Sequence, residues 1–538
     1  MPQTPRRQAR DFRLGEMFER GAQRHPDLPL WLSHPLDLRP SLGTRIQLRD
    51  AAALVAETAE QLRAAGVGVG DRVALVKSHR FDISILQGAA AQIGAVPAML
   101  WPHMDADVAT ELIIRLDRPF VVTDSLIRNE TLAKVDLPRL TSGVLTVTDS
   151  GLDVERFSPD EPEHPLTLPP DVVMIAHSSG TTGVPKLVGY PDLALGAHTQ
   201  FQAGVAAALR IPGPIAFAVS YLHGRMVSAL GASFARGYPI ALLDNTDSET
   251  AARMFAEVRP RIAESFPNVY ITWERLADHP DRPFSSVRYF INTFDAVHPR
   301  TVAKLLNASE SRFPLYFQAY GTTETGPLTL RVHTRQTIRR SPDGRCVGYP
   351  LPGFTKVRLR QRAGTDDAQR HRGEIECRAL GASRVYVGEP ERTAPGSPKS
   401  WWRTGDLGER GRFRCLHLLD RIVDEAPEIA SNLALEDILL QRMPSLSEVV
   451  VLPAEGDGPA IPVVCTVDEA PFELAAWHAA TADLPVLEAP LHLSWQQVPR
   501  SSTWKVRRLA LRAQLATGAL AGRATGEGQI GPPAEQIR

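Results

Sequence analysis

Between residues 49 and 247 the chain alternates amphipathic helical stretches with short apolar stretches, and this alternation limits how it can fold. Residues 49–66 carry apolar side chains at helical spacing, and residues 81–101 predict a helix that runs into a strand. Further strands are expected in apolar runs within residues 71–78, 118–124, 214–220 and 238–244. Helices that alternate with apolar strands favour parallel sheets with helices on their faces, so we expect the α/β class.

The pattern changes after about residue 344, where shorter strands separated by turns indicate a small β-rich subdomain. Residues 422–515 then predict a compact α+β unit. The last stretch, residues 516–538, is rich in small residues and is expected to be disordered. A chain of 538 residues is long enough for two or more domains, at about 100–200 residues per domain.

Charge and composition exclude several classes of partner. The chain has 60 Lys and Arg against 61 Asp and Glu, so no net field favours nucleic acid or an anionic membrane. Its N-terminal stretch lacks the apolar core of a signal peptide, and no run approaches about 18 apolar residues. We therefore expect a soluble, cytoplasmic protein. The cysteines lack the paired spacing of a zinc site or a disulfide framework and are expected to be buried thiols: Cys346, Cys377, Cys415 and Cys465.

A loop rich in hydroxyl residues, HSSGTTGVPK at residues 177–186, follows an apolar stretch at residues 172–176. Glycines let the backbone approach a ligand closely, so that its N–H groups can bind an anion. The loop predicts a polyphosphate site made by Ser178, Ser179, Gly180, Thr181, Thr182, Gly183 and Lys186. A hydroxyl-rich surface turn is the alternative, because the spacing is not that of the Walker motif. Lys186 supports the phosphate site, because the chain has seven lysines against fifty-three arginines and an ordinary surface cation is therefore expected to be arginine.

Three stretches further along the chain supply the other parts of a nucleotide site. QAYGTTETGPL at residues 318–328 contains Glu324, whose carboxylate is a suitable oxygen ligand for Mg²⁺. WWRTGDLGE at residues 401–409 places Asp406 in a tight turn, where a carboxylate can accept both ribose hydroxyls. PRSSTWKVRR at residues 499–508 supplies Lys505 within a segment otherwise rich in arginine.

These motifs, in this order and spacing, resemble the adenylate-forming superfamily of acyl- and aryl-CoA synthetases, peptide-synthetase adenylation domains and beetle luciferases. The resemblance covers about residues 15–512. It implies a large N-terminal domain, residues 1–420, and a small mobile C-terminal domain, residues 421–515, with a hinge near Asp420 and Arg421. It also implies that the protein uses ATP and Mg²⁺ to join a carboxylate to AMP, mainly by positioning the reactants and neutralising charge.

The resemblance implies roles for the residues around the nucleotide. The loop at residues 177–186 would hold the β- and γ-phosphates of ATP. Tyr320 would flank adenine, with Gly321 and Thr322 in the same binding segment. Thr323 would lie beside the α-phosphate, and Glu324 would bind Mg²⁺.

The remaining matches lie where the acid, the ribose and the C-terminal domain would meet. Asp406 would accept the ribose hydroxyls, with Arg421 nearby. Lys505 would bridge the incoming carboxylate and the ribose-phosphate. His223, in the segment SYLHGRM, would form a wall of the acid pocket and belong with Lys505 and Thr323 to the catalytic group. Taken without its neighbours, His223 could equally be a packed core histidine.

The acid pocket departs from the family pattern in a way that bears on the substrate. Relatives carry Gly-Gly-Ala-Pro before the Tyr-Gly-Thr-Glu motif, whereas this chain has NTFDAVHP, with Phe294 and Asp295 in place of small residues. Ala319 replaces a glycine of many relatives. These changes predict a narrower, more polar pocket for a compact or aromatic acid, unless this branch simply builds the strand end differently.

The region that would receive a thiol departs further. Val423 occupies the usual hinge position, and Ala430 aligns with the glycine that lets a pantetheine arm pass close to the backbone. Pro427 and Glu428 crowd the same segment, and Trp504 precedes the lysine where glycine is common. The motifs for the first half-reaction, formation of the acyl-adenylate, therefore look intact. Transfer of the acyl group to a thiol, the second half-reaction, is in doubt.

Three functions follow. The first is a ligase of specialised metabolism, such as antibiotic biosynthesis, that passes an acyl group from AMP to CoA or to a carrier-protein thiol. The second has the same AMP chemistry with a non-thiol acceptor: an amide-forming ligase, or a diazo-forming enzyme that activates nitrite, an oxyacid, for an arylamine. The third is a catalytically silent nucleotide-binding protein, which the retention of Lys505 in an arginine-rich segment disfavours.

Overall fold

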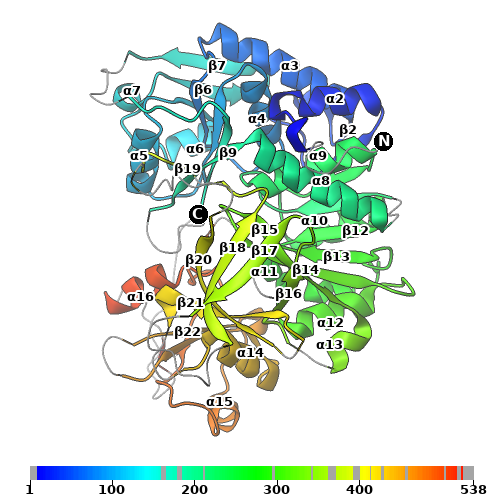
Figure 1. Cartoon of the computed structure of the whole chain (residues 1–538), viewed down its shortest axis with the longest axis vertical. Helices are drawn as coiled ribbons and strands as arrows, with labels where there is room; N and C mark the ends of the chain where they lie inside the picture. Colours follow the sequence, from blue (N-terminus) through cyan, green and yellow to red (C-terminus); the bar gives the residue numbers. More distant parts are fainter. Residues whose placement is uncertain are drawn as a thin grey trace.

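The structure is a computed structural model with three β-sheets. It describes residues 9–158, 165–178, 184–209, 213–293, 297–340, 343–361, 371–383, 385–389, 391, 400–411, 413–425, 429–454, 458–501, 505–517 and 523–524. Two large sheets and their helices form the upper part of Figure 1, and the third sheet lies at the bottom, in the orange and red part of the chain.

The first large sheet has eight strands, and its central strands β8, β4, β3, β5 and β6 are parallel. In spatial order its strands are β19 (Val385–Val387), β9 (Leu187–Pro191), β8 (Val172–His177), β4 (Val96–Met99), β3 (Arg72–Leu75), β5 (Phe120–Thr123), β6 (Gly143–Thr148) and β7 (Gly151–Arg156). The expected strands within residues 71–78 and 118–124 are thus confirmed as β3 and β5.

The second large sheet has thirteen strands; it is parallel from β14 to β1, and antiparallel on the other side of β14 and at the edge pair of β1 with β2. Its order is β17 (Thr355–Arg360), β18 (Arg372–Ala379), β20 (Trp402–Arg410), β21 (Leu416–Arg421), β16 (Cys346–Pro350), β15 (Gly326–His333), β14 (Leu315–Thr322), β13 (Tyr289–Asn292), β12 (Ile262–Ser265), β10 (Ile215–Ala218), β11 (Ile240–Leu242), β1 (Pro29–Leu32) and β2 (Arg45–Gln47). The β-rich stretch after residue 344 therefore continues this sheet through the pairing of β15 with β16 and does not form a separate one.

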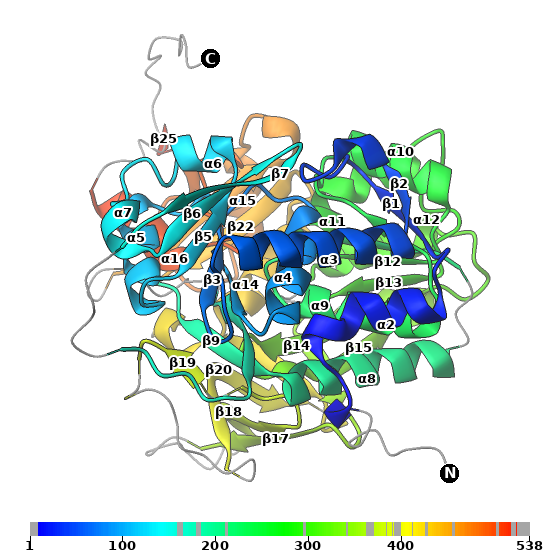
Figure 2. The ribbon, with the colours of Figure 1, turned by 90° about the horizontal axis from the view of Figure 1, so that it is seen from above.

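Helices cover both faces of the large sheets, as the alternating pattern predicts, so the α/β class is confirmed. Figure 2 shows α3, α4 and α9 between the two sheets, and the largest buried apolar cluster joins residues of these helices to β3 and β10. The helices of this central layer are α2 (Met17–Arg24), α3 (Leu48–Ala64), α4 (Asp82–Gln92), α8 (Asp192–Ala208) and α9 (Gly224–Arg236). The outer faces carry α5 (Ala106–Arg115), α6 (Ser125–Asn129) and α7 (Leu137–Leu140) on one sheet, and α10 (Ser248–Val258), α11 (Pro267–Thr272), α12 (Pro299–Ala308) and α13 (Arg335–Arg340) on the other.

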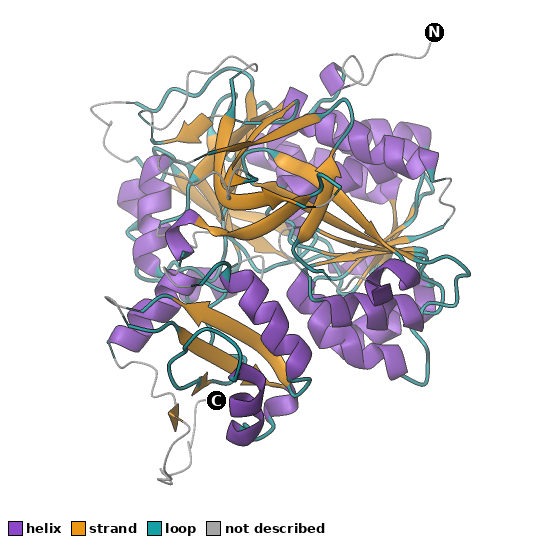
Figure 3. Ribbon diagram, turned by 60° about the horizontal axis from the view of Figure 1, so that its bottom comes forward, coloured by secondary structure: helices purple, strands orange, loops and turns teal. Residues whose placement is uncertain are grey.

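The third sheet belongs to a small α+β unit that follows β21, seen apart from the large sheets in Figure 3. Its strands are β22 (Leu446–Leu452), β23 (Ile461–Thr466), β24 (Leu491–His492) and β25 (Arg523–Ala524), with the helices α14 (Asn432–Arg442), α15 (Leu474–Thr481) and α16 (Arg508–Ala516). Alternate side chains of β22 pack against α14 and α15 on one face and α16 on the other. β25 pairs with β24 inside the tail expected to be disordered, and most of that tail lies outside the described residues.

Two compositional expectations can be compared with the structure. All four cysteines are buried and free, as expected. Within the described residues, none of the helices is both long and apolar enough to span a membrane.

Candidate active site

A cavity of about 400 Å³ lies where the large sheets meet the small α+β unit. Twelve of the residues singled out from the sequence line it: Ser178, Lys186, His223, Ala319, Tyr320, Gly321, Thr322, Thr323, Glu324, Asp406, Arg421 and Lys505. Asp420 lines it as well, whereas Val423 and Ala430 do not. Ten others lie outside the described residues: Ser179, Gly180, Thr181, Thr182, Gly183, Phe294, Asp295, Pro427, Glu428 and Trp504. Residues separated by more than 300 positions in the chain thus share one concave surface.

The two ends of the hydroxyl-rich loop are held together at the end of the β8–β9 hairpin. The Ser178 backbone N–H donates to the Lys186 carbonyl at 2.8 Å, and the Lys186 N–H donates to the Ser178 hydroxyl oxygen at 2.9 Å. The Lys186 ammonium lies 5.0 Å from the centroid of the Tyr386 ring, a favourable cation–π position. The lysine is therefore fixed at the mouth of the loop.

Glu324 is held by residues that follow in the chain. Tyr386 donates its hydroxyl to Glu324 Oε1 at 2.8 Å, and the Ser383 N–H donates to the Glu324 carbonyl at 2.6 Å. Tyr190 donates its hydroxyl to the Thr323 carbonyl, and burial, with a smaller effect of Glu324, raises the pKa of Tyr190 so that it stays protonated. Tyr386 therefore contacts both the cation and the carboxylate at this end of the cavity.

The carboxylate of Asp406 accepts a hydrogen bond at each of its two oxygens. Tyr320 donates its hydroxyl to Asp406 Oδ2 at 2.7 Å, and Arg421 Nε donates to Oδ1 at 3.3 Å. Gly405 before it has φ +79°, a left-handed conformation that favours glycine. Asp406 and Arg421 are paired residues on β20 and β21, which explains why two distant motifs meet.

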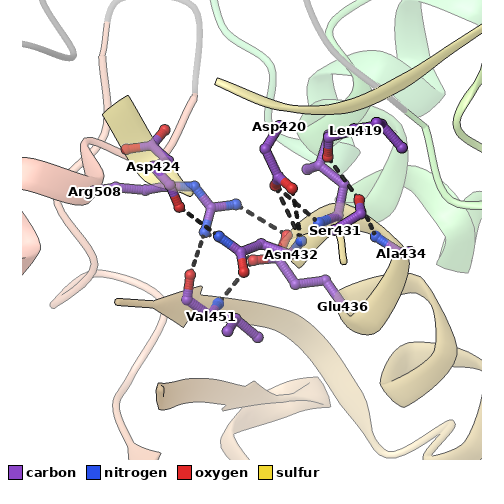
Figure 4. A network of polar contacts seen from close by, with 10 residues as sticks. Leu419, Asp420, Asp424, Ser431, Asn432, Ala434, Glu436, Val451 and Arg508 are labelled. Atoms are coloured by element: carbon purple, nitrogen blue, oxygen red, sulfur yellow. Dashed lines mark hydrogen bonds and ion pairs between the residues drawn. The ribbon is translucent and has the colours of Figure 1, made fainter. Parts of the chain in front are cut away.

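Asp420 connects the large sheet to the small unit, and Figure 4 shows the network around it. Its carboxylate accepts the Asn432 N–H at 2.9 and 3.0 Å, in the first turn of α14, where Ser431 is the N-cap. Burial raises the pKa of Asp420 to about 7. Arg508 forms a two-pronged ion pair with Glu436 of α14, at 2.8 and 2.9 Å. The segment that carries Lys505 is thus tied to the helix that follows the hinge.

His223 and Lys505 face the same part of the cavity from different domains. His223 is the N-terminal flanking residue of α9 and is buried, and burial lowers its pKa to about 3, with smaller contributions from His177, His79 and Lys505. Its imidazole is therefore neutral near pH 7 and can accept a hydrogen bond but carries no charge. The Lys505 carbonyl accepts the Ser501 N–H at 2.8 Å, which fixes the backbone of the lysine.

The part of the cavity lined by His223 and Arg225, where the motifs predict the acid and which we call the acid end, contains an ion pair that the motifs did not reveal. Arg225 Nε donates to Glu264 Oε1 at 2.6 Å, Nη2 donates to Glu264 Oε2, and Nη1 donates to Gln202 Oε1. Arg225, Gln202 and His198 line the cavity, and Glu264 lies behind them with 1% exposure. Arg225 is two positions after His223 in SYLHGRM and could have been noticed there, whereas Glu264 on β12 belongs to no motif.

The fold and the cavity define a class of proteins in which a large α/β unit and a small α+β unit enclose a common cavity. An amide bond synthetase from Marinactinospora thermotolerans has this fold, with a TM-score of 0.71 and 20% identity over 93% of this chain and 99% of that one. The model of the AMP-binding enzyme family matches residues 18–387. This chain belongs to that family, which makes it an AMP-forming ligase that uses ATP with Mg²⁺.

Two curated relatives span nearly the whole chain. A 3-amino-2-hydroxy-4-methoxybenzoate diazotase from Streptomyces cremeus is 38% identical over 96% of this chain and 97% of its own length. A long-chain fatty acid–CoA ligase from Mycobacterium tuberculosis is 24% identical over 93% of this chain and 98% of its own length. By their names, these proteins thus form three kinds of product: a CoA thioester, an amide and a diazo compound.

Proposed function

We propose that this protein is a cytoplasmic, ATP-dependent diazotase that activates nitrite and transfers its nitrogen to an arylamine bearing a carboxylate. The observation that carries the proposal is the Arg225–Glu264 ion pair at the acid end of the cavity. The 38% identity to a diazotase of a substituted aminobenzoate over 96% of the chain supports it.

The ion pair disfavours an extended apolar substrate. A long acyl chain would have to lie against the charged guanidinium of Arg225. It would displace the water around that guanidinium and offer no hydrogen-bond acceptor in its place. Arginine has five N–H groups, and three of them are used by Glu264 and Gln202, so among the contacts of the described residues two remain for a ligand. A planar carboxylate matches two adjacent guanidinium donors, which is how an aminobenzoate would be oriented.

The reaction uses the nucleotide end in the ordinary way for the family. A nitrite oxygen attacks the α-phosphorus of ATP and pyrophosphate leaves, giving a nitrosyl–AMP anhydride. The arylamine nitrogen then attacks the nitroso nitrogen, an amine proton is lost and AMP leaves. The resulting N-nitrosoarylamine isomerises, takes up a proton and loses water to give the diazonium ion.

Within this proposal the residues keep the roles that the motifs imply. The loop from Ser178 to Gly183, with Lys186, would neutralise the β- and γ-phosphates, and Glu324 would hold Mg²⁺. Tyr320, Gly321 and Thr322 bind adenine, Asp406 and Arg421 the ribose, and Thr323 and Lys505 the α-phosphate and the attacking oxyanion. His223 and Ala319 would border nitrite, and the narrow, polar pocket expected from Phe294 and Asp295 in the sequence would suit so small an oxyanion.

A product assay tests the function. Pyrophosphate release and azo-dye coupling are measured with ATP, Mg²⁺, nitrite and either 3-aminobenzoate or aniline. We expect both signals to require nitrite, and we expect aniline, which lacks the carboxylate, to have a KM about 10- to 100-fold higher because a charge-assisted pair is lost.

Parallel reactions replace nitrite and the amine by a benzoate with CoA, a phosphopantetheinylated carrier protein or hydroxylamine. Rapid acyl-CoA or acyl-carrier formation without nitrite would overturn the proposal in favour of a thioester ligase. Hydroxamate formation with no diazonium product would instead indicate an amide-forming ligase.

A further inference from the structure

Cys346, Cys415 and His417 form a cluster of metal-binding side chains outside the cavity. One potential ligand atom from each residue lies within 4.8 Å of the others. Cys346 is 2% exposed and Cys415 is 7% exposed, so both sulfurs are shielded from water. None of the three residues lines the active-site cavity, and nothing in the proposed reaction uses them.

The sheet register explains why the three side chains meet. Cys346 on β16 lies directly opposite His417 on β21, and residues opposite each other in an antiparallel pair bring their side chains together. Cys415 precedes His417 by two positions and therefore projects to the same face of the sheet. The neighbouring residues Val347 and Leu418 line the cavity, which places the cluster on the opposite face of the same two strands.

The imidazole of His417 is oriented as it is in many metal sites. His417 Nε2 lies 2.8 Å from Asp343 Oδ2, which makes Nε2–H the donor and leaves Nδ1 as the atom directed at the sulfurs. Nδ1 lies 3.7 Å from Cys415 Sγ. Asp343 is itself fixed, because its other oxygen accepts the N–H groups of Arg345 and Cys346 at 3.0 and 3.2 Å. A carboxylate on the far nitrogen is the common partner of a metal-ligating histidine.

We propose that Cys346, Cys415 and His417 bind a zinc-type divalent cation, with Asp343 as the positioning residue for the histidine. Two thiolates and an imidazole suit zinc, and the ligand distances of a tetrahedral site place a sulfur and a nitrogen about 3.6 Å apart. The observed 3.7 Å between Cys415 Sγ and His417 Nδ1 fits that spacing without moving the backbone. Two thiolates would neutralise the charge of the cation.

The cluster connects β16 to the strand that leads into the small α+β unit, β21. β16 pairs with β15, which forms a hairpin with the strand that carries Tyr320. β21 ends at Arg421, directly before the small unit. The cation would therefore join the strand next to the nucleotide end to the strand that leads into the hinge, and its role would be structural.

Metal binding to the untagged full-length protein tests the proposal without any variant. The protein is stripped with a chelator under reducing conditions, titrated with Co²⁺, and then titrated with Zn²⁺. We expect a thiolate-to-cobalt charge-transfer band that saturates at about one equivalent and is abolished by Zn²⁺. No charge-transfer band at excess Co²⁺ would overturn the proposal, and so would a Cys346–Cys415 disulfide isolated in place of bound metal.

Variants locate the site. Cys346→Ser and Cys415→Ser should lose the band, while Cys465→Ser, a buried cysteine of the small unit, should keep it. Asp343→Asn should keep the band but weaken the affinity about 10- to 100-fold, as removal of such a partner typically does. Circular dichroism checks that each variant is folded. Loss of the band in Cys465→Ser alone would place the metal elsewhere and contradict the assignment.

Discussion

The two ends of the active-site cavity are built in different ways. At the nucleotide end, Tyr320, Asp406 and Arg421 come from three family motifs and hydrogen-bond to one another. At the acid end, Arg225 and Glu264 come from α9 and β12 and form a buried ion pair. In the proposed function the first group binds the nucleotide, and the second group selects the substrate. Variants that affect one end and spare the other test this division.

Lys505→Ala should have the largest effect, because it removes the positioned ammonium between the two ends. A lost charge of this kind typically lowers the rate of the first half-reaction about 10²- to 10³-fold. Binding of ATP should change little, since most of the residues expected to bind the nucleotide lie before residue 421. Nitrite-dependent pyrophosphate release measures the rate, and Lys134→Ala, an exposed lysine, is the matched control. Pyrophosphate release close to the unmodified protein's would remove Lys505 from the reacting centre.

The second variant acts on the acid end alone. Arg225→Gln by itself would leave the Glu264 carboxylate buried and unpaired, which typically costs about 3–5 kcal/mol of stability. The double variant Arg225→Gln, Glu264→Gln removes both charges and keeps hydrogen-bonding groups. We expect its KM for an aminobenzoate to rise about 10- to 100-fold, with the KM for ATP unchanged. If the KM for aniline rises equally, the Arg225 guanidinium does not bind the carboxylate of the aminobenzoate.

Glu324→Gln acts on the nucleotide end and should have an intermediate effect. The amide keeps the shape and the contact with Tyr386 but removes the anionic oxygen that suits Mg²⁺. The Mg²⁺ concentration for half-maximal activity should rise roughly tenfold, while the KM for the arylamine stays constant. Titration of Mg²⁺ at fixed ATP checks this. An unchanged Mg²⁺ requirement would assign the metal to another carboxylate, with Asp295 the first to test.

The motifs lead directly to residues that line the cavity, because each motif is a short continuous stretch, although Asp406 lies in strand β20 and not in the tight turn expected for it. The roles of these residues toward a nucleotide stay predictions. Asp406 follows a glycine that needs its left-handed φ, and such signals can be read directly. The acid end could not be predicted in the same way, since Glu264 meets Arg225 only through the packing of β12 against α9. The metal-binding cluster shows the same limit. The spacing of cysteines along the chain gave no sign of it, because Cys346 and His417 are neighbours only across two strands.

The smallest effect is expected from Ala430→Gly, at the edge of the hinge. Ala430 is exposed and directly precedes Ser431, the N-cap of α14. Removing its methyl group opens the backbone where thioester-forming relatives carry glycine, at a stability cost below about 1 kcal/mol. Diazonium formation should be unaffected, because neither end of the cavity changes. CoA thioester formation should stay marginal, since the acid end still holds a charged pair suited to an arylamine carboxylate. The assay compares acyl-CoA formation from a benzoate in the variant and the unmodified protein. A large gain in acyl-CoA would mean that a single methyl group, and not the acid end, had decided the acceptor.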